Sequence, residues 1–400
     1  MSETRTYPYP YRAALAVCSD LDETPDRHVY EQIARYLNTT ADTAMGPGLG
    51  LEVGNTIYFD MAPDQFAYWN TDDAGRELVR ALIRSGHIDC FHSFGDLATT
   101  RAHAARALDE LDRHGCRIQV WIDHARAATN LGADIMCGQG DVPGAVAYHA
   151  DLTVAFGVSY VWRGRVTSVV GQDVRRRLAG IARRPHLLAS TRTLAKEAAK
   201  GLLARTGSVK YAMHRGNSVL HDVRLRDGAP VREFLRCNPH WAAVDEGETA
   251  DGLADVVVDP MLDTLVRRGG ACVLYTHLGK IKDRSRPFGP RTCAAFARLA
   301  ERQQRGELLV TTTRRLLGQR RAAREAQVRF AAADGGLQRI DVAYAGPPAD
   351  LDGFTVYVAD PDRAALAVNG VPAPRVERNP PDHTGRASIA LPWPRLGYPA

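Results

Sequence analysis

The feature that most constrains the fold is a repeated alternation of short apolar runs and amphipathic stretches over the first three quarters of the chain. The runs have the length and composition of buried strands, and the stretches between them repeat their apolar residues at helical spacing. Strands are predicted at residues 13–18, 50–59, 88–91, 117–122, 157–162, 270–275 and 308–311, and helices at 25–37, 71–85, 102–114, 149–156, 255–268 and 314–324. Repeated βα units of this kind predict a parallel sheet, either closed as a barrel or doubly wound.

Polar side chains follow several of the predicted strands at the point where each strand ends. Asp20 and Asp22 follow the first strand, His92 and His124 follow two later ones, and His277 follows a strand near residue 275. In both architectures the active residues lie at the carboxyl ends of the strands. Carboxylates and imidazoles gathered there could bind one divalent cation and leave positions open for water and substrate. The sequence therefore predicts a metal-dependent hydrolase.

The last 75 residues or so have a different pattern from the rest of the chain. Short β-type runs at 328–332, 339–345, 354–359, 364–368 and 387–391 are separated by Pro, Gly, Asp and Asn clusters. This pattern is typical of a small all-β domain. We therefore expect a barrel-like α/β domain over residues 1–324 and an accessory β-rich domain over residues 325–400.

Composition limits the compartment and the class of protein. The chain is 45% apolar and 24% charged, which permits a sizeable core without disulfides. Its seven cysteines are scattered and form no CxxC pair, as expected for reduced cytosolic thiols rather than a cysteine zinc site. No secretory signal and no apolar run of membrane-spanning length is evident, so we expect a cytoplasmic protein with no transmembrane segment.

Positive charge is concentrated in residues 163–226, here called the basic segment. It holds fifteen Lys or Arg residues against three acids, within a net charge of +5 for the whole chain. One interpretation is a set of solvated helix faces, and the other is an insertion that attracts an anionic small-molecule or glycan substrate. A nucleic-acid partner is not expected, because no helix-turn-helix, zinc-finger or RNP motif accompanies the charge.

Two motifs resemble those of a known family. AVCSDLDET, which ends in Asp20 and Asp22, and SGHIDCFHSFGD, which contains His87, His92 and Asp96, are similar to the first two motifs of the polysaccharide deacetylases, the NodB-homology domain of carbohydrate esterases. The resemblance covers roughly residues 11–318. It implies a distorted (β/α) barrel and hydrolysis of an amide bond at a metal site.

The resemblance also implies roles for individual residues. Asp20 corresponds to the general base, Asp22 and His92 to metal ligands, and His277 in LYTHLG to the general acid. Because Leu21 separates the two aspartates, their roles could be exchanged. Asp96 stands where the family has a further ligating histidine, and the family's middle Arg-Pro motif is replaced by VWIDHA.

A metal held by Asp22, His92 and Asp96 would have open positions for water and a substrate oxygen. Zn²⁺ suits two carboxylates and one imidazole, and Mn²⁺, Fe²⁺ or Co²⁺ are also compatible with such ligands. Asp20 could then take a proton from water, and His277 could protonate the departing amine.

Each of these residues has a structural alternative. Asp20 and Asp22 could cap the following helix, and Asp96 could cap the next one. His87 could be a structural histidine or line the substrate site, and His124 could be a ligand, a base or a lining residue. Two further residues are candidates for substrate contact, Arg236 and Trp241.

The leading functional hypothesis is N-deacetylation of an amino-sugar or a related metabolite. A metal-dependent glycosidase of the same superfamily is the first alternative. The second is a catalytically silent relative that binds carbohydrate or acts as a scaffold.

Overall fold

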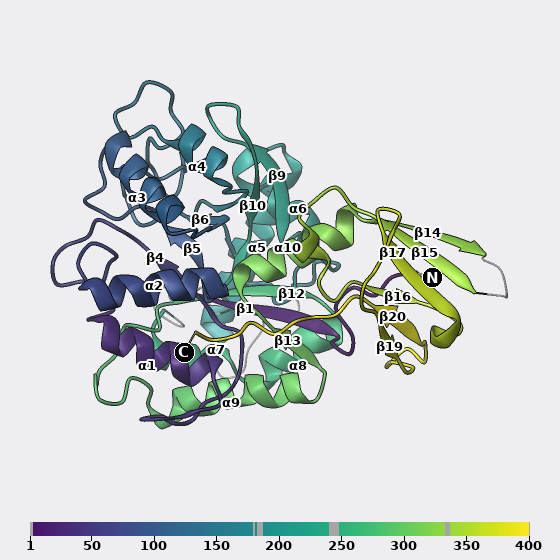
Figure 1. The fold of residues 1–400 in the computed structure, drawn as a ribbon. Coiled ribbons are helices and arrows are strands. Elements are labelled where there is room, and N and C mark those ends of the chain that lie inside the picture. The colour runs from purple at the N-terminus through teal and green to yellow at the C-terminus, as the bar shows by residue number, and fades with distance from the viewer. Residues whose placement is uncertain (1–2, 179–180, 182–186, 240–247, 333–336, 400) are drawn as a thin grey trace.

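The computed structural model describes residues 3–178, 181, 187–239, 248–332 and 337–399. Over these residues the chain has a mixed α/β fold, with a curled, half-barrel sheet flanked by helices and separate small sheets (Figure 1). The main sheet runs in the order β8 (Val166–Thr167), β11 (Arg236–Cys237), β12 (Ala271–Thr276), β1 (Ala13–Ser19), β4 (Gly54–Ile57), β5 (Ile88–His92), β6 (Val120–Ile122), β7 (Tyr160–Trp162), β10 (Pro230–Phe234) and β9 (Leu220–Arg224).

The sheet is parallel except at one edge. The short strand β13 (Leu308–Val310) pairs with the first half of β1, and β4 pairs with its end. Only β9 and β10 are antiparallel among the described pairs of this sheet. The pairing of the described strands does not close on itself, since β8 and β9 stand at its two ends. The predicted α/β class with a parallel sheet is thus confirmed, whereas a complete barrel is not.

Alternate residues of β1 explain how the sheet is buried on both faces. Leu15 and Val17 belong to the cluster formed with the outer helices, and Ala14, Ala16 and Cys18 belong to the inner cluster. Small residues on the inner face allow the curled sheet to approach itself closely. All seven residues of β1 are buried, so this strand is the centre of the core.

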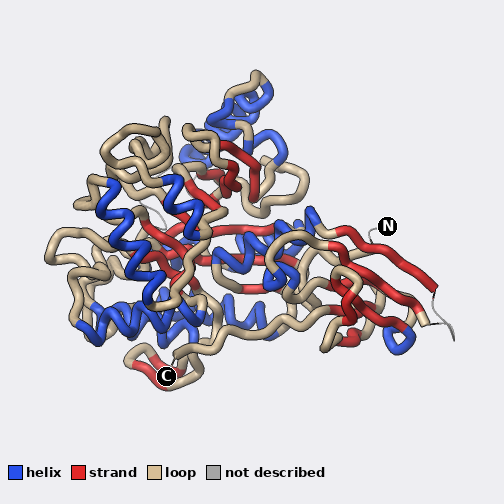
Figure 2. The backbone as a smooth tube through the Cα atoms, turned by 45° about the horizontal axis from the view of Figure 1, so that its top comes forward, coloured by secondary structure: helices blue, strands red, loops and turns tan. Residues whose placement is uncertain are grey.

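Helices cover the outer face of the main sheet, as Figures 1 and 2 show. They are α1 (Arg27–Asn38), α2 (Asp73–Ser85), α3 (Arg101–Arg113), α4 (Ala150–Phe156), α7 (Ala250–Val256), α8 (Asp259–Arg268) and α9 (Pro290–Gln304). A further helix, α10 (Thr313–Glu325), adds Leu316 and Leu317 to the inner cluster. The single helix predicted over 255–268 is two helices, α7 and α8, which are separated by Val257 and Val258.

The N-caps of α1 and α3 decide two of the structural alternatives. Asp26 caps α1, and its side chain accepts hydrogen bonds from the backbone of His28 and Val29. Thr100 stands at the N-cap of α3. Neither Asp20 nor Asp22 caps α1, and Asp96 does not cap α3, so all three carboxylates are available for another role.

The basic segment pairs many of its charges with carboxylates. It includes β8, α5 (Leu187–Arg205), the 3-10 turn η2 (Val209–Tyr211), α6 (Met213–Gly216) and β9. The fully buried Glu197 of α5 binds Arg176 at 2.9 Å and Lys200 at 2.7 Å. Arg163 binds Glu233 of β10 at 3.0 Å. These cations therefore hold the segment to itself and to the main sheet.

Residues beyond α10 form two small sheets at one end of the molecule (Figure 2). One contains β14 (Gln327–Ala332), β15 (Gln338–Ala343), β17 (Ala364–Val368) and β18 (Val371–Pro372), and the other contains β16 (Thr355–Tyr357), β20 (Ser388–Ala390) and β19 (Glu377–Asn379). Thr4 forms a β-bridge with Val356, so the amino-terminal segment lies beside β16. The prediction that this region consists mainly of short β-strands is confirmed.

The carboxyl-terminal segment returns from the small sheets to the main sheet, where Figure 1 places the C-terminus near α1. The backbone N–H of Leu396 donates to Glu52, just before β4, and Arg315 of α10 donates to the carbonyl of Pro394. These contacts lie at the amino ends of the strands. No helix among the described residues combines the length and apolar character needed to cross a bilayer.

Candidate metal centre

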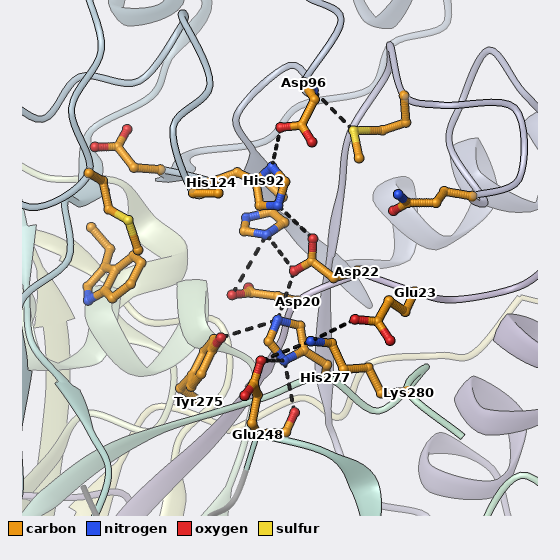
Figure 3. Close-up of a pocket in the computed structure, with 16 residues that line it drawn as sticks. Asp20, Asp22, Glu23, His92, Asp96, His124, Glu248, Tyr275, His277 and Lys280 are labelled. Atoms are coloured by element: carbon orange, nitrogen blue, oxygen red, sulfur yellow. Dashed lines mark hydrogen bonds and ion pairs between the residues drawn. The ribbon is translucent and has the colours of Figure 1, made fainter. Parts of the chain in front are cut away.

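A pocket of about 350 Å³ lies at the carboxyl ends of the strands (Figure 3). Parallel strands bring residues far apart in sequence to this edge: Asp20 and Asp22 follow β1, His92 ends β5, and His277 follows β12. Four of the residues predicted to meet here therefore do so. The fifth strand-end residue, His124, follows β6 and also lines the pocket.

Asp22 stands among three imidazole rings. Its Oδ1 lies 2.7 Å from Nε2 of His124, and its Oδ2 lies 3.1 Å from Nε2 of His92 and 2.8 Å from Nε2 of His277. Burial alone would raise the pKa of Asp22, but the surrounding imidazoles hold it well below its usual range. The carboxylate is therefore ionised and available as a ligand.

Two sets of side chains share Asp22 and could each hold a metal ion. The first is Asp22, His92 and His124, and the second is Asp20, Asp22 and His277; within each set the ligand atoms lie within 4.8 Å of one another. Asp96 belongs to neither set. The geometry thus favours His124 over Asp96 as the third ligand.

Asp96 instead contacts the other nitrogen of His124. Its Oδ1 lies 2.9 Å from Nδ1 of His124, and the dashed line in Figure 3 marks this contact. A carboxylate oxygen at this distance requires a proton on Nδ1, which leaves Nε2 to face Asp22 and a cation. The aromatic ring of Tyr58 stacks on His92 with an interplanar angle of 20° and fixes that ring in turn.

The backbone beside each of the three residues adopts an unusual conformation. Glu23 follows Asp22 with a φ of 58°, Ser93 follows His92 with 49°, and Ala125 follows His124 with 40°. Side chains other than glycine seldom occupy this left-handed region, and such strain gathers at functional sites. The turns that these residues make redirect the chain directly after the strand ends.

Asp20 forms an ion pair with an arginine that is buried and does not line the pocket. Both carboxylate oxygens lie 2.8 Å from the guanidinium of Arg236, which is fully buried between Trp162 and Tyr275. Burial alone would raise the pKa of Asp20, but Arg236 keeps it below its ordinary value. Asp20 is therefore an ionised carboxylate with a fixed orientation next to the ligand set.

His277 is oriented by the loop before α7. Its Nδ1 lies 2.8 Å from the backbone carbonyl of Glu248, which can only accept, so Nδ1 carries a proton and Nε2 faces the pocket. The hydroxyl of Tyr275 lies 3.2 Å from that Nε2. Figure 3 shows both contacts on the side of Asp22 opposite His124.

Several lining residues were not predicted. Tyr275 could have been found, because it lies two residues before His277 and therefore on the same face of the strand. Glu248 and Lys280 come from loops that carry no recognisable pattern. The remaining unpredicted residues that line the pocket are Glu23, Met61, Gln65, Asp123, Ala125, Met136 and Trp162.

Two residues predicted to line the substrate site, His87 and Arg236, lie elsewhere. His87 is buried at the amino end of β5, beside Ser85 and Tyr398, so it is a structural histidine whose pKa burial lowers to about 4. Arg236 is not among the pocket residues and positions Asp20 instead. Trp241 lies outside the described residues.

The chemistry of the donor set fits a divalent cation. One carboxylate and two imidazoles are ligands suited to Zn²⁺ and to other first-row transition metals. Asp22 already faces three ring nitrogens, an arrangement that needs either protons or a cation between the groups. The side chains of Asp22, His92 and His124 define this candidate site.

The sequence and the structure were compared with known proteins, and no relative was found. No protein-family model matches the chain, and no match was found among the curated proteins or the solved structures.

Proposed function

We propose that this protein is a metal-dependent hydrolase of amide bonds, which removes an acyl group from an amine such as an amino-sugar. The observation that carries the proposal is the convergence of Asp22, His92 and His124 next to an ionised, arginine-held Asp20. The resemblance of the first two motifs to polysaccharide deacetylases points to the same reaction. A binding or scaffold protein would have no need of a buried, oriented carboxylate beside the ligand set.

In this proposal Asp22, His92 and His124 hold the ion, and Asp96 orients His124. A divalent ion there would polarise the amide carbonyl and make a bound water more acidic. Zn²⁺ is the first candidate, because its usual ligands include this combination, and Mn²⁺, Fe²⁺ or Co²⁺ remain compatible.

Asp20 and His277 divide the proton transfers. Asp20 accepts a proton from the attacking water as the water oxygen bonds to the carbonyl carbon. The carbon–nitrogen bond then breaks, and Nε2 of His277 donates a proton to the leaving nitrogen. The products are a carboxylate and an amine, so one water is consumed for each amide. Arg236 keeps Asp20 ionised and aimed at the water, and the Glu248 carbonyl keeps Nε2 of His277 toward the pocket.

Release of acetate from N-acetylated amines and amino-sugars by the zinc-loaded protein tests the proposal. We expect Asp20→Asn to lower kcat by roughly 100-fold or more while zinc remains bound stoichiometrically. The matched variant Asp109→Asn lies on the exposed face of α3 and is expected to leave kcat unchanged.

Two results would contradict the proposal. One is full activity in Asp20→Asn, and the other is acetate release that persists after the zinc has been removed and its absence verified. Formation of new reducing ends from a glycoside, without acetate release, would point to the glycosidase instead.

A further inference from the structure

The charge of the pocket indicates what kind of substrate it accepts. Six of the described lining residues carry carboxyl groups, and Lys280 is the one lysine or arginine among them. Arg236 neutralises Asp20, and a bound divalent cation would neutralise Asp22 with one positive charge left over, while Asp123 is buried and accepts a hydrogen bond from Trp121. Three carboxylates then remain around the pocket: Glu23, Asp96 and Glu248.

Lys280 is already engaged by two of these acids. Its Nζ lies 2.9 Å from Oε1 of Glu248 and 3.1 Å from Oε1 of Glu23, as Figure 3 shows. The three side chains together therefore carry one net negative charge. The side chain of Glu23 is 67% exposed and that of Asp96 is 50% exposed, so both carboxylates can be reached from solvent.

The described residues of the basic segment do not contribute positive charge to the lining of the pocket. None of the described residues that line the pocket belongs to residues 163–226. Arg163, Arg176 and Arg226 of the segment pair instead with Glu233, Glu197 and Asp141. When Asp96 and the remaining charge of a divalent ion are counted, the described pocket residues still carry one net negative charge, which would repel an anionic substrate.

We propose that the substrate carries an ammonium group a few bonds from the scissile amide, and that Glu23 is a residue that selects for it. This inference rests on the proposed function. It assigns the substrate a positive charge, whereas the basic segment led us to expect a negatively charged one. An acylated diamine and a partly deacylated amino-sugar both have this chemistry. A pocket of about 350 Å³ accommodates a short alkyl chain or a single sugar ring.

Three acetamides of matched length test the charge preference. N-acetyl-1,4-diaminobutane is cationic, N-pentylacetamide is neutral and 5-acetamidopentanoate is anionic. Binding to the zinc-loaded full chain is measured by ligand-observed NMR at low and high salt, and hydrolysis is followed by acetate release. A disaccharide of glucosamine and N-acetylglucosamine, compared with its fully acetylated form, separates the amino-sugar source from the diamine source.

We expect the cationic acetamide to bind about tenfold more tightly than the neutral one, and the anionic acetamide to bind most weakly. Raising the ionic strength is expected to reduce the preference. Glu23→Gln is expected to reduce it about threefold, whereas Glu31→Gln on α1, which lies away from the pocket, leaves it unchanged.

The two proposals fail separately. Equal binding of the three acetamides, stronger binding of the anion or no effect of Glu23→Gln would overturn the inference even if acetate is released. A cation preference that depends on Glu23, without any acetate release, would support the inference and overturn the hydrolytic function instead.

Discussion

His124 faces a carboxylate with each of its ring nitrogens, Asp22 at Nε2 and Asp96 at Nδ1. Burial alone would lower the pKa of His124, but these two carboxylates raise it to about 10. In the absence of an ion, a proton therefore occupies the position that a cation would take. Binding of a metal must release this proton, so the affinity for metal is expected to rise with pH.

The different positions of His124 and Asp96 lead to different mutational effects. We expect His124→Gln to abolish stoichiometric zinc binding, because it removes a ligand atom. We expect Asp96→Asn to retain one zinc per chain but to weaken its affinity roughly 10- to 100-fold, as is typical for a residue that orients a ligand. Equilibrium titration with a competing chelator measures both values. The reverse order of effects would make Asp96 the ligand.

Ala125 offers a test of the strained backbone. With a φ of 40°, it is in a region where an alanine costs about 1–2 kcal/mol and a glycine very little. We expect Ala125→Gly to increase the free energy of unfolding by up to about 1 kcal/mol, after allowance for the greater freedom of glycine in the unfolded chain. Ala133→Gly, whose backbone is not left-handed, is expected to be destabilising. Equal losses in the two variants, measured by urea denaturation, would contradict the strain.

At the scale of the elements, β5 carries the metal residue His92 at one end and a buried acid near the other. Asp89 accepts a hydrogen bond from the backbone N–H of Arg314, yet burial raises its pKa from 3.8 to about 6. The pKa is higher in the folded state, so this group's contribution to stability is fully present below about pH 4. It is lost as the pH rises through 6.

Replacement of Asp89 removes this pH dependence. We expect Asp89→Asn to gain stability relative to the natural chain between pH 4 and pH 7, by roughly 2–3 kcal/mol, because the amide cannot ionise. Urea denaturation at several pH values measures the difference. A difference between the two proteins that stays constant with pH would contradict the raised pKa.

Sequence periodicity predicted seven strands of the main sheet, β1, β4 to β7, β12 and β13, because each is a local apolar run. It did not predict the four strands β8 to β11, nor the helices α5 and α9. Strand-end residues such as Asp20 and His92 could also be placed at one edge of the sheet, because parallel strands have their carboxyl ends at the same edge. The partner of Asp20 could not be predicted, since Arg236 reaches it across 216 positions of sequence. The choice between His124 and Asp96 likewise depends on how two loops meet, which leaves no periodic signal.

At the scale of the whole molecule, both ends of the chain tie the small sheets to the main sheet. Thr4 pairs with Val356, and the carboxyl-terminal segment packs against the amino ends of the strands. The guanidinium of Arg315 lies 3.8 Å from the ring of Trp393, and Tyr398 packs beside His87. The β-rich region is therefore not joined to the rest through α10 alone.

Removal of residues 392–400 tests this arrangement. We expect the free energy of unfolding to fall by roughly 2–4 kcal/mol, because hydrogen bonds to Glu52 and Arg315 and the packing of Trp393 and Tyr398 are lost. Zinc affinity is expected to change little, since the pocket lies at the opposite ends of the strands. If thermal and urea unfolding are unchanged, the segment does not contribute to the free energy of unfolding and the prediction is wrong.

Anomalous diffraction from crystals soaked in zinc tests the metal centre most directly. We expect one strong peak about 2.0–2.2 Å from a carboxylate oxygen of Asp22 and from the Nε2 atoms of His92 and His124, with Asp96 still on Nδ1 of His124. The absence of a peak in this pocket, or a peak that these three residues do not ligate, would contradict the metal centre and the hydrolase built upon it.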